Sequence, residues 1–180
     1  QIKALIDRSQ VLWARKYIHK LNDPRGNWRH GFLLSLGATK GKDLFEGVSL
    51  TAKYFFDAVG AYFKGSLTYR QIEEPGDIRQ HPTALADASK KARALVIPSV
   101  NREKILFIGT GNTCRSQMAT ALTQCCFGDR IEAESAGIHP AREINPLMVE
   151  AMEERGIDMA FRRPKSIEQA ISFGKPDLVI

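Results

Sequence analysis

The chain has 180 residues, of which 43% are hydrophobic and 26% are charged, and its formal net charge at pH 7 is +6. These values are ordinary for a soluble globular protein that buries a core, and the length corresponds to one or two domains. No apolar run approaches the ~18 residues of a membrane-spanning helix, and no signal peptide is present, so we expect no membrane partner.

The charge distribution and the cysteine content indicate the kind of binding partner and the cellular location. Residues 1–30 hold seven Lys and Arg against two Asp and Glu. A basic face for phosphate-bearing cofactors or nucleic acid is one interpretation, but a solvated helix face is the simpler one, and we expect no nucleic-acid partner. The three cysteines are an odd number, and Cys125 and Cys126 are adjacent. They make no disulfide framework, which predicts a reducing, cytoplasmic location.

Helical and strand patterns alternate along the first part of the chain, with turn residues between them. The expected elements are a helix over 1–21, a loop over 22–27, a strand over 31–37, a small turn over 38–42, a helix over 43–63, a strand over 66–71, a turn over 73–77 and a helix over 81–95.

The alternation continues in the second part, after a linker expected over 98–103. Its elements are a strand over 104–108, a helix over 116–127, a strand over 131–134, helices over 146–155 and 166–173, and a strand over 177–180. This order predicts an α/β fold with parallel sheets and flanking helices. Ligands of such folds bind at the carboxyl ends of strands, a place that only 37–41 and 109–116 occupy here.

The most informative stretch is 105–116, an apolar strand that runs into a compact loop and then a helix. A loop in that place directs backbone N–H groups and the positive end of the helix dipole toward one point. Arg115 adds a planar guanidinium suited to two oxygens of a tetrahedral anion. Gly111 and Asn112 tolerate backbone angles that other residues avoid. The plain alternative is a tight strand-to-helix turn with a surface arginine.

This stretch resembles the phosphate loop of low-molecular-weight protein tyrosine phosphatases and of the thioredoxin-coupled arsenate reductases that share their fold. The loop of that family reads Cys, five residues, Arg, Ser. Arg115 and Ser116 fit the end of the pattern, so the nucleophilic cysteine belongs at position 109, where this chain has Gly109. The resemblance implies catalytic roles for Arg115 and Ser116, and an oxyanion-binding role for the loop residues Thr110, Gly111, Asn112, Thr113, Cys114 and Arg115.

Several motifs favour the reductase branch of this family. The Gln117-Met118-Ala119 sequence follows the loop where the phosphatases usually have proline, and further reductase-like motifs lie at 135–137, 143–146, 152–158 and 163–166. The resemblance covers 102–180 and implies a three-layer αβα half over 104–180, with arsenate or phosphate as ligand and thioredoxin or another thiol reductant as partner. The resolving cysteines, or the general acid of the phosphatases, would follow the strand at 177–180. Because residue 1 begins within a helical pattern, we expect a fragment truncated at both ends.

The remaining candidate residues carry weaker signals. Cys114 lies beside the binding arginine, where a structural role is favoured over a reactive one. Cys125 and Cys126 are expected to be small buried residues of a helix. His139 and Glu134 have no partner at metal-ligand spacing, so we expect no metal.

The first part, 1–97, resembles the second half of the flavodoxin-like NAD(P)H-dependent FMN reductases. The resemblance is carried by Gln1–Arg8, Gly37–Gly41, Leu44–Gly47 and Gly76–Ile78. It implies FMN and NAD(P)H as cofactors and leaves open a homo-oligomer formed through this half. The residues beside the flavin ring would be Gly37, Ala38, Thr39, Lys40 and Gly41, although the same pattern also suits a plain strand-end turn. Trp13 is expected to be buried in a subunit or domain contact rather than stacked on flavin.

Two classes of function follow. In the first, an arsenate reductase-like module and a flavin reductase module form one enzyme of arsenic detoxification, which is inactive in this chain because Gly109 replaces the nucleophile. In the second, the loop is a non-catalytic phosphate- or arsenate-binding regulatory module on a flavoprotein. A protein tyrosine phosphatase is the third alternative, and both Gln117 and Gly109 disfavour it.

Overall fold

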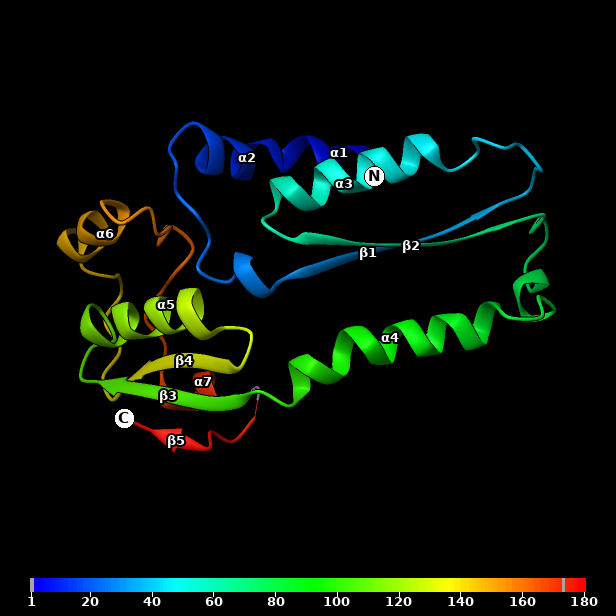
Figure 1. Cartoon of the computed structure of the whole chain (residues 1–180). Coiled ribbons are helices and arrows are strands. Elements are labelled where there is room, and N and C mark those ends of the chain that lie inside the picture. Colours follow the sequence, from blue (N-terminus) through cyan, green and yellow to red (C-terminus); the bar gives the residue numbers. More distant parts are fainter. Residues whose placement is uncertain (1, 173) are drawn as a thin grey trace.

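The computed structural model describes residues 2–172 and 174–180, and it has an α/β fold with two parallel sheets. In the first, β1 (His30–Gly37) pairs with β2 (Tyr62–Arg70), and α3 (Glu46–Ala58) connects them. In Figure 1, α1 (Ile2–Arg8), α2 (Gln10–Tyr17) and α3 lie on one side of this sheet, and α4 (Ala84–Val100) lies on the other. Two short 3₁₀ helices, Gly26–Trp28 and Asp77–Arg79, precede β1 and α4.

The second sheet has the order β4-β3-β5, with β3 (Glu103–Gly109), β4 (Ile131–Gly137) and β5 (Leu178–Val179) all parallel. The helices around it are α5 (Arg115–Phe127), α6 (Pro146–Glu153) and α7 (Ile167–Ile171). One buried cluster joins α5 and α6, and another joins the sheet to α7 through Leu106, Ala136 and Ala170. The predicted parallel α/β architecture is therefore confirmed.

Several boundaries differ from the sequence prediction: the helix expected over 1–21 is divided into α1 and α2, and the strand expected over 66–71 begins at Tyr62. Two further differences have a local cause. The helix expected over 43–63 ends at Ala58, because Gly60 adopts a left-handed φ of 67° and the next strand starts at Tyr62. The segment 98–103 was expected to be an irregular linker. This is wrong for its first half, because α4 continues through Pro98 to Val100. Pro98 cannot donate to the carbonyl of Ala94, but Ala94 is exposed and water can take that place.

The segment that leads into β1 docks on the second half of the chain. The N–H of Asn22 donates to the Gly156 carbonyl at 2.8 Å, and the Asp158 N–H donates to the Asn22 carbonyl at 2.9 Å. Farther along, the Trp28 ring packs against Gly128, and the Arg102 guanidinium lies 4.1 Å from the ring centroid. Backbone pairing and an aromatic anchor therefore hold the two halves together.

We expect Gly128→Ala to destabilise the chain by about 1–3 kcal/mol, the usual cost of overpacking. An added Cβ would overlap the indole of Trp28 and would lie 2.5 Å from the Gln124 carbonyl oxygen. Urea unfolding measures the change. Gly47→Ala in α3 is the matched control, because a Cβ there meets nothing within 4 Å. Equal stability of the two variants would contradict this packing.

Candidate functional site

The loop between β3 and α5 has its carbonyl groups tied to one neighbouring segment. The carbonyls of Gly109 and Thr110 accept from the N–H groups of Ile138 (3.0 Å) and His139 (2.8 Å). Those of Gly111 and Thr113 accept from Ala141 and Asn145, both at 3.0 Å. With the carbonyls drawn toward 138–145, the loop is fixed without using its own N–H groups.

Those N–H groups remain available for a ligand. In the described part of the chain, no N–H of residues 110–116 donates to another protein group. Arg115 begins α5, its side chain is exposed, and it makes no ion pair with any described carboxylate. Free N–H groups at a helix start, beside a free guanidinium, form the arrangement that binds a tetrahedral anion.

Buried amides hold the loop in shape. Asn112 has a left-handed φ of 52°, as its residue type suggested, and its side chain is 1% exposed. Its Nδ2 donates to Ser116 Oγ at 3.0 Å, and its Oδ1 accepts from Gln117 Nε2 at 3.0 Å and from the Lys165 N–H at 3.1 Å. Gln117, 2% exposed, also donates to the Arg163 carbonyl at 3.1 Å. The Gln117 side chain therefore fastens the loop to 163–165, a role that the sequence pattern did not suggest.

Gly109 occupies the nucleophile position without any conformational need for glycine. Its φ lies outside the left-handed region, and an added Cβ would meet only Ser116, at 3.3 Å from Oγ and 3.8 Å from Cβ. A side chain would therefore fit after a small shift of the Ser116 hydroxyl. Because Asn112 already donates to that hydroxyl, its own proton is free to point elsewhere.

The cysteines lie in different surroundings. Cys114 is half-buried and packs with Cys125 against the methionine-rich cluster of α5 and α6. Burial, and secondly the neighbouring Cys126, raise the pKa of Cys125. Cys126 is exposed, so the expectation that both were buried is wrong for Cys126, which lies on the outer side of α5.

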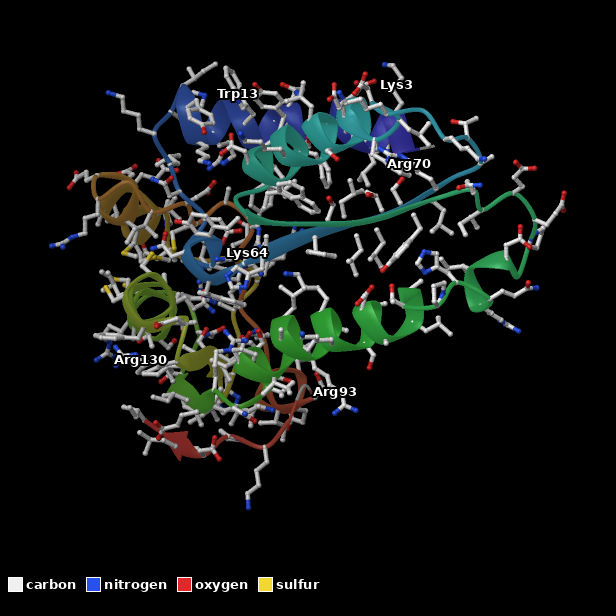
Figure 2. The ribbon with its side chains drawn as sticks, turned by 45° about the vertical axis from the view of Figure 1, so that its right-hand side comes forward. Lys3, Trp13, Lys64, Arg70, Arg93 and Arg130 are labelled. Atoms are coloured by element: carbon white, nitrogen blue, oxygen red, sulfur yellow. The ribbon has the colours of Figure 1, made fainter. Side chains whose placement is uncertain are left out.

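The structure keeps the two predicted ligand loops apart. Gly37–Gly41 follows β1 as expected and is largely exposed. It lies at the end of the molecule opposite to the loop between β3 and α5 (Figure 1). Trp13 is 41% exposed on α2, with its ring 5.4 Å from that of Tyr17, so it is not buried in a contact within the chain, and its burial in a subunit contact stays a prediction (Figure 2).

No group of three or more His, Cys, Asp or Glu side chains among the described residues could hold a metal ion. None of their helices has the length and apolarity needed to cross a bilayer.

Comparison with known proteins agrees with this geometry. Residues 104–180 match the family described as low molecular weight phosphotyrosine protein phosphatase. Over 81 residues the chain is 42% identical to an arsenate reductase of Halalkalibacterium halodurans. The aligned residues make up 45% of this chain and 57% of that protein. The chain is 41% identical to arsenate reductase 2 of Staphylococcus epidermidis (45% and 60% covered) and to arsenate reductase 1 of Bacillus cereus (44% and 58% covered).

Residues 104–180 are thus similar to modules of the low-molecular-weight phosphatase and arsenate reductase type. The chain spans less than two thirds of the length of these curated relatives. The resemblance of 1–97 to flavin reductases stays a prediction.

Proposed function

We propose that residues 104–180 form an oxyanion-binding module that takes arsenate or phosphate without covalent catalysis. The observation that carries the proposal is the loop itself: its carbonyls are engaged by 138–145, its N–H groups are free, and Arg115 is unpaired among the described residues. Such a loop favours binding of an anion, because the anion accepts hydrogen bonds from the free N–H groups and interacts favourably with the positive end of the helix dipole.

Covalent chemistry has no nucleophile at the family's position in this loop, and the thiol that the loop does carry, that of Cys114, packs against the methionine-rich cluster of α5 and α6. In arsenate reduction or phosphoester cleavage by this route, a thiolate attacks the substrate, and Gly109 has no thiol. Neither Thr110 nor Thr113 has a hydrogen-bonded base among the described residues, and Ser116 Oγ receives its hydrogen bond from an amide. We therefore expect no turnover of arsenate or aryl phosphates by this chain.

We further propose that the first half is a flavin reductase-like module using FMN and NAD(P)H, joined to the oxyanion module in a cytoplasmic protein of arsenic detoxification. The exposed Gly37–Gly41 loop at the carboxyl end of β1 supports a ligand there. It lies at the opposite end of the molecule from the loop between β3 and α5 (Figure 1), so the two loops do not face each other within one chain. The arrangement therefore favours a regulatory, anion-sensing role over a single fused enzyme, and thioredoxin or another thiol reductant would be a partner only of a thiol-bearing form.

The proposal is tested by titrating phosphate into the chain while amide shifts are recorded. We expect the largest saturable shifts at 109–116 and 138–145, because these segments form the loop and hold its carbonyls. Arg115→Ala should weaken binding by roughly tenfold or more, the loss of a charge-assisted bidentate contact. Arg93→Ala, which removes an exposed arginine of α4 outside both segments, is the matched control. No shift at millimolar phosphate, or equal shifts in the Arg115→Ala variant, would refute the proposal.

A further inference from the structure

A cavity of about 800 Å³ lies at the outer edge of β4, where that strand has no neighbour in the sheet. Its walls come from 23–25 of the first half and from α5, β4 and 158–172 of the second. Residues 109–116 do not line it, although Gln117, whose side chain holds Asn112 of the oxyanion loop, does. Its volume falls in the range of small-molecule sites.

Three of the four carboxylates that line the cavity are already paired, and the fourth, Glu168, is exposed. Asp23 accepts from Arg25 at 3.1 Å and from Arg29 at 2.9 Å, and despite its burial these contacts lower the pKa of Asp23 to about 2. Asp158 is paired with Arg15 at 2.6 Å, an ion pair between the two halves of the chain. Glu134 pairs with Lys165. These carboxylates therefore have little capacity left to neutralise a further cation.

Arg162 also lines the cavity and is a cation that these carboxylates do not pair with. It is half-buried, and its guanidinium donates to the neutral Gln124 Oε1 but makes no ion pair with a described carboxylate. Burial, and secondly the positive charge of Arg25, lower the pKa of Arg162. Two guanidinium groups thus face one cavity and repel each other, a cost that an anion between them would offset.

The wall also offers apolar surface, from Pro24, Phe161 and Pro164. We propose that this cavity binds a small organic anion, whose carboxylate or phosphate group lies between Arg25 and Arg162 and whose carbon body contacts Pro24, Phe161 and Pro164. A guanidinium fork matches either head group, and both arginines are placed by contacts already made within the protein. The site does not depend on the oxyanion loop and stands whether or not that loop binds arsenate.

The test uses the whole chain with Arg115→Ala, which weakens the loop site. Succinate and glycerol 3-phosphate are titrated separately while amide shifts are recorded. We expect saturable shifts at 23–25 and 158–165 with at least one probe in the millimolar range, and the probe that binds more tightly identifies the head group. Adding Arg162→Gln should weaken that binding about tenfold, because a charge-assisted contact is lost.

Arg130→Gln is the matched control: Figure 2 shows Arg130 beyond the end of α5, outside the cavity lining, and it should leave the affinity unchanged. If Arg162→Gln fails to fold, Arg25→Gln must produce the same weakening. Absence of saturable shifts with both probes, or equal affinity with and without the arginine, would overturn the proposal. Because phosphate binding at 109–116 is measured in the unmodified chain, the two sites can fail independently.

Discussion

Gly109→Cys is expected to create a thiol of unusually low pKa. The backbone at position 109 accepts a side chain, and the added Cβ would lie 3.3 Å from Ser116 Oγ, at the start of α5. Free N–H groups, the helix terminus and Arg115 would all stabilise a thiolate there, so its pKa should fall by about 1–4 units from the ordinary ~8.5. Alkylation by iodoacetamide as a function of pH, followed by mass spectrometry of each cysteine peptide, measures this pKa.

Phosphate should protect the new thiol from alkylation, since both occupy the same loop. The exposed Cys126 in the same molecule is an internal reference that phosphate should not protect. Combining Gly109→Cys with Arg115→Ala should raise the thiol pKa again, because one cation is removed. A new thiol with an ordinary pKa and no protection by phosphate would mean that the loop does not concentrate positive potential at position 109.

Gln117→Leu is expected to lower both the stability of the chain and its affinity for phosphate. Gln117 is 2% exposed, and its Nε2 donates to the backbone and side chain of Asn112 and to the Arg163 carbonyl. Leucine would leave these acceptors buried with fewer donors, which should cost about 2–4 kcal/mol of stability. Phosphate affinity should fall as well, because Asn112 would no longer be held in its left-handed conformation.

Urea unfolding and phosphate titration measure the two losses. Gln10→Leu is the matched control, since Gln10 is exposed at the start of α2 and its side chain makes no hydrogen bond among the described residues. Its effect should stay within about 0.5 kcal/mol. A Gln117→Leu variant as stable as the control would show that the amide network does not support the loop.

Local signals predicted much of the fold and the centre of the site. Apolar strand patterns at 31–37 and 104–108 placed β1 and β3, although β1 leaves Leu34 and Leu36 exposed. Asn112 was expected to tolerate the left-handed region, which it adopts. Arg115 was expected at the start of a helix beside the loop, where it lies.

Features that depend on distant partners could not be predicted in the same way. The carbonyls of the loop are tied to 138–145 because β3 and β4 pair in register, with Gly109 beside Gly137. Gly137 permits this close approach, since a Cβ there would lie 3.0 Å from the Thr110 carbonyl oxygen. The docking of Trp28 against Gly128, and the cavity lined by Arg162, likewise need the tertiary arrangement of both halves. No short-range pattern encodes such contacts.

The central claim is that this chain binds an oxyanion without transforming it. The most direct test is equilibrium dialysis of the unmodified chain against arsenate with a thiol reductant present, followed by measurement of arsenate and arsenite on both sides of the membrane. We predict an excess of arsenic on the protein side, all of it as arsenate, with arsenite no higher than in a dialysis without protein. Equal arsenic on both sides would contradict binding by the loop, and arsenite above the protein-free level would contradict the inference drawn from Gly109.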